Sequence, residues 1–194
     1  MTSVPPLSDV HKIGIFGNTE NKDDSNLLEV SEETSKSIYQ ITKFKNSNSS
    51  VSNLSIQDLE ISNNPMIVKS NSKTRILWTG PYQWLIVSDN KILEDELKVF
   101  DSNNFAVTDL SNTRAIINVK GQDSLEVLKK GCPYNFNNLE KNMSINSVYH
   151  SIAVTVDFIE DNPHKMRIMC LRSFGESLYH SITDACLEYG YKAI

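Results

Sequence analysis

Asp109 and four histidines are the side chains of this chain whose types could support acid–base or metal chemistry. The histidines are His11, His150, His164 and His180, and none lies four residues from another or beside a serine or cysteine nucleophile motif. A helical metal-ligand pair and a hydrolytic triad both need such arrangements, so neither is indicated. We expect His164 in a hairpin turn and His180 on the polar side of the last helix, both exposed to solvent.

Asp109, Trp78 and Trp84 each allow a chemical and a structural interpretation. Asp109 ends an expected strand, where a carboxylate could hold a substrate amine or a pterin ring. An Asp-x-Ser sequence at a strand end more often closes its own turn through the side chain. Trp78 and Trp84 flank a Gly-Pro turn and could stack on a flat ligand, but aromatic residues in strands usually belong to the core. We favour the structural interpretation for all three.

Arg114 and Arg172 lie beside expected strands rather than in a phosphate-binding loop. A guanidinium group is always charged and pairs well with carboxylates. Two uses remain open for these residues, namely an ion pair within the fold and an ion pair with a partner.

Cofactor and metal motifs are missing from the sequence. None of the 7 glycines has the spacing of a dinucleotide-binding or Walker A loop, in which backbone N–H groups approach phosphate. The three cysteines, Cys132, Cys170 and Cys186, form no close pair of the kind that zinc and redox sites use. We expect no catalytic, cofactor-binding or metal-binding residue in this chain, and we expect reduced thiols, as in a cytosolic protein.

The charge distribution argues against nucleic acid as a partner. The 194 residues carry a net charge of −5, and residues 20–33 hold six acids against one base, so the rest of the chain is neutral. A nucleic-acid binder needs a basic face. Because the sequence has no signal-peptide pattern and no apolar run of about 20 residues, we expect a soluble, cytoplasmic protein with no membrane partner.

The periodicity of apolar residues predicts an α+β fold with antiparallel sheets and helices packed on one face. Asp89 or Asn90 is expected to cap a short helix in which Leu93, Leu97 and Phe100 fall at i, i+4 and i+7. A second helix is expected over residues 122–130, and a third begins at a capping box of Ser173 and Glu176. The expected strands cover residues 38–45, 66–69, 75–79, 83–88, 105–110, 113–119, 151–159 and 166–171.

Two related subdomains are expected, at residues 28–104 and 105–194, after an N-terminal arm of residues 1–27. An Asn/Ser-rich segment, residues 46–55, is interpreted as a loop. The arm contains an apolar island, Ile13, Ile15 and Phe16, which is either a partner-binding segment or packed on the chain's own body. We also expect the acidic stretch 20–33 to meet a basic patch of a partner.

Three collinear segments between residues 74 and 190 resemble the gamma subunit of heterotetrameric sarcosine oxidase. Residues 77–87, LWTGPYQWLIV, are similar to that family's LW-x-GP-x-x-WL hairpin. The second segment joins residues 107–111, VTDLS, to Arg114, Gly121 and residues 127–133, VLKKGCP. The third comprises residues 172–178, RSFGESL, and residues 188–190, EYG.

The resemblance implies a fold related to the folate-binding region of aminomethyltransferase and a place beside the alpha, beta and delta subunits. It implies a complex that oxidises sarcosine to glycine with FAD, FMN, NAD and tetrahydrofolate, none of them held by gamma, which would assemble chiefly on alpha. The sequence departs from the family at residues 142–146, which lack the glycine of a Phe-x-x-Gly turn, and at His150, where threonine is common.

Two other interpretations remain open. The chain could be a stand-alone folate-binding module or one-carbon transferase of the aminomethyltransferase type, in which Asp109 would orient the reacting amine. It could also be a relative of the folate-dependent iron–sulfur assembly proteins, whose Lys-Gly-Cys signature matches residues 130–132 but does not continue at Pro133.

Overall fold

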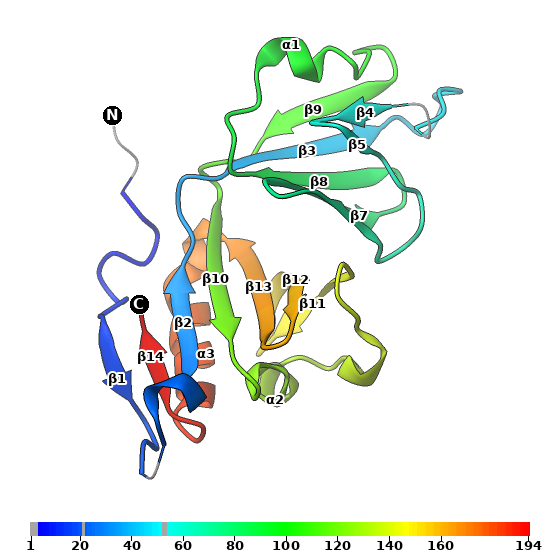
Figure 1. Ribbon diagram of the computed structural model, residues 1–194. Helices are drawn as coiled ribbons and strands as arrows, with labels where there is room; N and C mark the ends of the chain where they lie inside the picture. Colours follow the sequence, from blue (N-terminus) through cyan, green and yellow to red (C-terminus); the bar gives the residue numbers. More distant parts are fainter. Residues whose placement is uncertain (1–3, 21, 52–53) are drawn as a thin grey trace. The chain divides into compact units, whose positions relative to one another are not determined.

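The computed structural model describes residues 4–20, 22–51 and 54–194 (Figure 1). The remaining positions, residues 1–3 and 21 of the expected arm and residues 52–53 of the Asn/Ser-rich segment, lie outside the described residues. The chain forms two compact units. Unit 1 comprises residues 1–34, 112–141 and 145–194, and unit 2 comprises residues 35–111 and 142–144.

Unit 1 is built on a seven-stranded sheet of order β1-β14-β2-β10-β13-β12-β11. Of the strand pairs with an assigned register, only β14 with β2 is parallel. In chain order, the strands are β1 (Gly14–Phe16), β2 (Leu28–Glu32), β10 (Arg114–Lys120), β11 (Ser144–Tyr149), β12 (Ile152–Asp161), β13 (His164–Leu171) and β14 (Tyr191–Ala193).

Two helices, α2 (Ser124–Gly131) and α3 (Gly175–Cys186), pack against this sheet. Residues 115–119 of β10 are all buried, and Ala115, Ile117 and Val119, which share one face of the strand, are completely so. The Cα of Gly175 lies so close to Ala115 that an added Cβ would be 2.8 Å from the alanine methyl group. The small residues at this contact let α3 approach the strand.

Unit 2 holds a five-stranded sheet of order β6-β7-β8-β3-β9 and a small β4-β5 pair. Its core contains Trp84, Ile86 and Phe105, which pack with residues of the segments around the sheet. The elements are β3 (Ser37–Lys43), β4 (Ser55–Ile56), β5 (Leu59–Glu60), β6 (Val68–Ser70), β7 (Thr74–Gly80), β8 (Gln83–Ser88), α1 (Glu94–Leu97) and β9 (Phe105–Asp109).

The three helix predictions differ in outcome. The helix over residues 122–130 is confirmed as α2. The predicted capping box of Ser173 is wrong: Ser173 lies inside the 3-10 turn η3 (Arg172–Phe174), so its hydroxyl does not reach the start of α3. For the helix expected after residue 89 or 90, Leu97 and Phe100 do pack in the core of unit 2. The expected cap is wrong, because α1 begins after Leu93, which is 57% exposed and donates its backbone N–H to Glu96 Oε2 at 2.8 Å.

The described residues of the expected N-terminal arm pack on unit 1. The side chain of Leu7 is fully buried, and its backbone N–H donates to Glu32 Oε1 at 3.0 Å. The His11 ring lies 2.9 Å from the Tyr179 hydroxyl and 3.0 Å from the Ile194 carbonyl oxygen. These contacts join the beginning of the chain to its end, which no local sequence pattern indicates.

The two units do not coincide with the expected subdomains, residues 28–104 and 105–194, because each sheet is assembled from segments that are distant in the sequence. Strand β2 pairs with β10 in unit 1, whereas β9, which precedes β10, pairs with β3 in unit 2. The chain therefore leaves unit 1 after residue 34 and returns to it at residue 112.

Asn142 lies in residues 142–146, one of the two departures from the family pattern. Asn142, just before β11, has a φ of 63°, a left-handed conformation that asparagine tolerates better than most residues. Its side-chain oxygen accepts hydrogen bonds from Ser70 Oγ at 3.2 Å and Arg75 Nη1 at 3.1 Å. The turn is therefore formed without the glycine. His150, the other departure, is also left-handed, with a φ of 42°.

Candidate functional site

The Asp109 carboxylate is engaged in its own turn. Asp109 ends β9, is exposed, and accepts the backbone N–H of Ser111 on Oδ1 at 2.8 Å. The Ser111 hydroxyl in turn accepts the N–H of Ile38 at 3.0 Å. The structural interpretation of Asp109 is confirmed, because the carboxylate closes the connection between β9 and β10.

Both tryptophans belong to the core of unit 2. Trp84 is 1% exposed and donates its indole N–H to the Ser62 carbonyl at 2.7 Å. Trp78 lies opposite Trp84 in the β7–β8 pair and packs, partly buried, against the same core. The structural interpretation is therefore confirmed: the Trp84 ring has both its surface and its N–H used inside the fold, and Trp78 packs against the same core.

The histidines do not meet in one site. His180 is exposed, as expected. The prediction for His164 is only partly right: it lies at the β12–β13 hairpin, but it is partly buried against Phe158, with ring centroids 5.6 Å apart. Within residues 4–20, 22–51 and 54–194, no group of three His, Cys, Asp or Glu side chains could hold a metal ion.

The three thiols are free and buried in the core of unit 1. Burial raises the pKa of Cys170 to about 11 and that of Cys186 to about 12. Cys132 donates its thiol hydrogen to Ser147 Oγ at 3.2 Å. Cys170 and Cys186 are therefore neutral at physiological pH, whereas a reactive cysteine needs its thiolate form.

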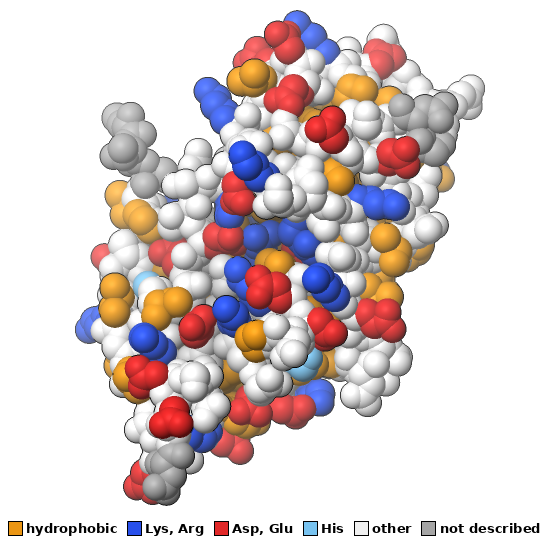
Figure 2. Space-filling view, in the orientation of Figure 1, with side chains coloured by type: hydrophobic (Ala, Val, Ile, Leu, Met, Phe, Trp, Pro, Cys, Tyr) orange, Lys and Arg blue, Asp and Glu red, His pale blue; other side chains and the backbone are white. Residues whose placement is uncertain are grey.

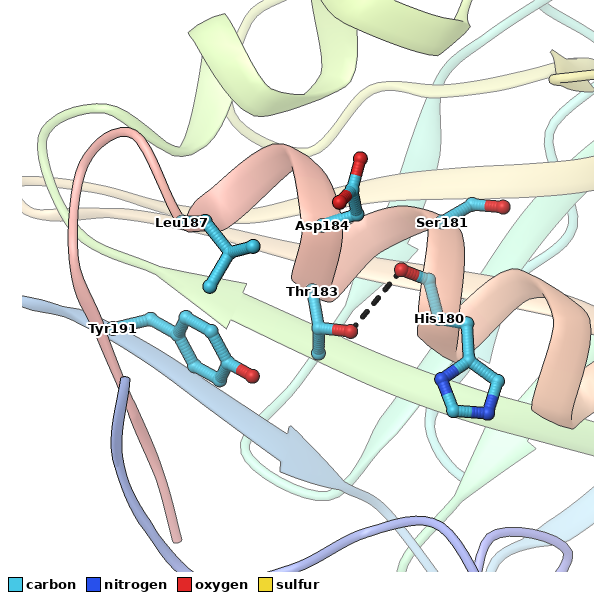
Figure 3. A pocket seen from close by; sticks show the side chains of 6 residues that line it. All are labelled: His180, Ser181, Thr183, Asp184, Leu187 and Tyr191. Carbon is cyan, nitrogen blue, oxygen red and sulfur yellow. Dashed lines mark hydrogen bonds between the residues drawn. The ribbon is translucent and has the colours of Figure 1, made fainter. Parts of the chain in front are cut away.

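A pocket of about 500 Å³ lies between α3 and β14 (Figure 3). It is lined by His180, Ser181, Thr183, Asp184, Leu187 and Tyr191. Its hydroxyl groups are already used: Thr183 Oγ1 donates to the carbonyls of Tyr179 at 2.9 Å and of His180 at 3.2 Å. The Tyr191 hydroxyl points toward Thr183, and burial raises the pKa of Tyr191.

The pocket suits binding better than catalysis, because no nucleophile in its lining is hydrogen-bonded to a base. Of the residues that line this pocket, the sequence analysis singled out only His180. Asp184 could have been found with it, since residues four apart share one helix face. Tyr191 comes from a strand that the sequence did not predict, and only the fold brings it to α3.

The apolar island adjoins this pocket and lies at the edge of the sheet. Its Ile15 and Phe16 lie in β1, which pairs with β14, and the Phe16 ring stacks on Tyr191 with centroids 5.2 Å apart. Its side chains nevertheless remain open to solvent: Ile13 is 81%, Ile15 49% and Phe16 37% exposed. The backbone of the island is thus held on the chain's own body through β14, while the side chain of Ile13 remains largely in solvent.

Several acids of the stretch 20–33 have partners inside unit 1, and the expectation that the stretch meets a basic patch of a partner stays a prediction. Glu33 binds Arg167 with two hydrogen bonds of 2.6 and 3.0 Å. Glu29 lies 3.8 Å from Lys120, and Asp24 lies 3.9 Å from Lys192. On the face that Figure 2 shows, acidic and basic side chains are interspersed.

The sequence of this chain is similar to that of a sarcosine oxidase gamma subunit. The relative, "Sarcosine oxidase subunit gamma" of Corynebacterium sp. (strain U-96), is 29% identical over 121 residues, which are 61% of this chain. The chain spans 58% of the length of this curated relative. No family model matches the chain. The resemblance indicated by the three motif segments is confirmed by this comparison.

Two solved structures share the fold. Heterotetrameric sarcosine oxidase from Corynebacterium sp. U-96, in complex with pyrrole 2-carboxylate, matches with a TM-score of 0.75 and 20% identity, over 86% of this chain and 87% of that one. Glycine cleavage system aminomethyltransferase T from Bartonella henselae matches with a TM-score of 0.57 and 10% identity, over 82% of this chain and 46% of that one. The predicted α+β, aminomethyltransferase-like fold is confirmed. No helix among the described residues has the length and hydropathy to cross a membrane.

Proposed function

We propose that this chain is a gamma subunit of a heterotetrameric sarcosine oxidase, an oxidoreductase that converts sarcosine to glycine. The single observation that carries the proposal is the solved heterotetrameric sarcosine oxidase, one chain of which shares the fold over 87% of its length. The similarity to a named gamma subunit, over a stretch of 121 residues, supports the same assignment.

Within that complex, the chain would support assembly rather than catalysis. Asp109 is occupied by its turn, and the thiols of Cys170 and Cys186 are neutral and buried. The chain has no glycine-rich loop to receive the pyrophosphate of FAD or NAD. FAD, FMN, NAD and tetrahydrofolate would therefore be held by other subunits.

The alpha subunit is proposed as the chief partner, and Ile13, Ile15 and Phe16 as part of the contact. Burying one large apolar side chain contributes about 1.5–3 kcal/mol before ordering costs. Since β1 is already held by β14, little ordering of its backbone would be needed on binding.

Coexpression of the chain with alpha, beta and delta subunits of a sarcosine oxidase tests the proposal. We expect a complex of four different subunits that releases hydrogen peroxide when sarcosine is added. The chain alone, as the control, should have no flavin spectrum and release no peroxide. Failure of the folded chain to copurify with the other subunits would contradict the proposal, as would peroxide release by the chain alone.

A stand-alone folate-binding module is the second candidate, favoured by the fold shared with aminomethyltransferase T. Calorimetric titration of the isolated chain with tetrahydrofolate separates the two. Micromolar binding by the chain alone would favour the folate module, whereas an assembly subunit should give no heat of binding.

A further inference from the structure

Arg114 is a partly buried cation for which the described residues supply no counter-ion. It begins β10, and among residues 4–20, 22–51 and 54–194 no carboxylate lies within ion-pair distance of its guanidinium group. Burial lowers its pKa, which means that the environment disfavours the charge without compensating it. Of the two uses that the sequence left open, a pairing within unit 1 is therefore not realised.

The cavity around Arg114 has about 200 Å³ and no acidic residue in its lining. The walls come from β11, β12 and β13: Asn146, Ser147, Ala153, Val154, Thr155, Met169, Cys170 and Leu171. The nearest ionisable neighbour is the Cys170 thiol, whose pKa burial raises to about 11, so it stays neutral and does not offset the arginine. The cavity therefore contains one positive charge, that of Arg114, and is otherwise lined by neutral polar and apolar residues.

The size and composition of this cavity favour a carboxylate over a larger anion. A volume of about 200 Å³ lies below the range of roughly 300–1,000 Å³ that is usual for drug-sized ligands. One guanidinium fork matches a carboxylate with two parallel hydrogen bonds. Because the lining holds no second cation, a phosphate group would keep most of its charge uncompensated.

An exposed apolar side chain beside the cavity indicates that the carboxylate belongs to a polypeptide. Leu171 is directly opposite Arg114 in the β10–β13 pair and is 47% exposed. Phe174, three residues further on, is 49% exposed. A free small anion would leave both side chains in water, whereas an acidic and apolar segment would cover them and pair with Arg114 at once.

We propose that Arg114 and Leu171 form a docking site for an aspartate or glutamate of a partner subunit, with an apolar side chain of the same segment against Leu171. The identity of the partner rests on the proposed function. The expectation of an acidic ligand is independent of the proposed function, since it follows from Arg114 and its cavity alone. Arg172 is a poorer candidate, because its guanidinium already donates to the Val4 carbonyl and Asp9 and Glu176 line the neighbouring cavity.

A titration of the full isolated chain, followed by amide chemical shifts, tests the site without any partner subunit. The probes are a capped peptide that alternates leucine with glutamate, its leucine–glutamine counterpart, and sodium acetate. We expect shifts of residues 114, 147 and 169–171 with the acidic peptide, at least tenfold weaker binding of the neutral peptide, and loss of the shifts in Arg114→Gln. Equal binding of both peptides, or no shift with either, would overturn the proposal.

Affinity for the partner subunit supplies the second test, with Lys91→Gln as a control that removes one charge from an exposed lysine of unit 2. Arg114→Gln should bind the alpha subunit at least tenfold more weakly and with less salt dependence, while Lys91→Gln changes affinity less than twofold. Arg114→Lys should recover part of the affinity. The melting temperature of isolated Arg114→Gln should be unchanged or higher, because no ion pair of the described fold is lost.

The outcomes separate the two proposals. If wild type binds alpha and Arg114→Gln binds it equally well, the docking site is wrong while the subunit assignment stands. If wild type does not bind alpha but the acidic peptide shifts residues 169–171, the subunit assignment fails and the docking site stands. Acetate binding as strong as that of the acidic peptide would identify a free-anion site and overturn the docking site.

Discussion

The β7–β8 hairpin of unit 2 and strand β1 of unit 1 are both rich in large apolar side chains, but only the hairpin buries them. β8 lies between β7 and β3, and its Trp84, Leu85, Ile86 and Val87 are all at most 4% exposed. β1 lies at the edge of its sheet with one neighbour, β14, and Ile13 and Ile15 remain largely exposed. Covering elements, and not apolarity alone, decide whether an apolar segment is core.

Most of the exposed large hydrophobic side chains lie in unit 1, and this difference indicates where a partner would bind. In unit 1 they are Val4, Ile13, Ile15, Phe16, Val148, Leu171, Phe174, Leu187 and Ile194, whereas unit 2 has Phe44, Tyr82, Leu93 and Val99. Of these side chains, Leu171 lies directly opposite Arg114 in the β10–β13 pair. We therefore expect substitutions in unit 2 to change stability and surface substitutions in unit 1 to change assembly.

Trp84→Ala should have the largest effect on stability. We expect a loss of about 3–5 kcal/mol in the free energy of unfolding, because the substitution leaves a cavity and an unpaired Ser62 carbonyl. Urea unfolding of the isolated chain measures it. Trp78→Ala, at the partly buried position opposite, is the control and should cost less. Equal losses would mean that the deeper burial of Trp84 does not decide its contribution to stability.

Leu7→Ala tests whether the N-terminal segment belongs to the core of unit 1. We expect a loss of about 2–5 kcal/mol, since Leu7 is completely buried. Ile13→Ala, in the same segment but 81% exposed, should change stability by no more than about 0.5 kcal/mol. Thermal unfolding of the two variants compares them. A neutral Leu7→Ala would return residues 4–20 to the status of a free arm.

Gly17→Ala sharpens the comparison at the backbone that holds β1. Gly17 has a φ of 82°, and an added Cβ would lie 2.4 Å from the Leu187 carbonyl oxygen, so backbone must move. We expect a loss of about 1–3 kcal/mol, the cost of a strained backbone. Gly80 in the β7–β8 hairpin is the control, because its nearest neighbour is a flexible Gln83 side-chain oxygen at 3.9 Å. Chemical denaturation should show Gly80→Ala to be the milder change.

Asp109→Asn should have the smallest effect. Asparagine can accept the same Ser111 N–H, so we expect stability within about 0.5 kcal/mol of wild type and nearly unchanged turnover of the reconstituted complex. Asp109→Ala, which loses the acceptor, should cost about 0.5–1.5 kcal/mol. A drop of about 100-fold or more in turnover with an intact fold would make Asp109 catalytic.

The sequence by itself determined several elements of the fold and carried the motifs that resemble the sarcosine oxidase gamma family. The Gly-Pro turn with its flanking tryptophans, the β12–β13 hairpin and helix α2 follow from turn chemistry and apolar periodicity, which act over a few residues. The hydrogen bond that the Asp109 carboxylate accepts from the Ser111 N–H was predictable for the same reason, because it forms between residues two apart in an Asp-x-Ser turn.

Only the tertiary structure decided what the ends of the chain and the isolated charges do. The strands β1, β2 and β14 pair with one another or with β10, and β1 and β14, with three residues each, are too short to show a periodic pattern. Glu33 finds Arg167 across 134 positions of sequence, whereas Arg114 finds no acid among the described residues. An ion pair depends on which strands become neighbours, so the sequence can name the charges, but only the fold determines which of them remain unpaired.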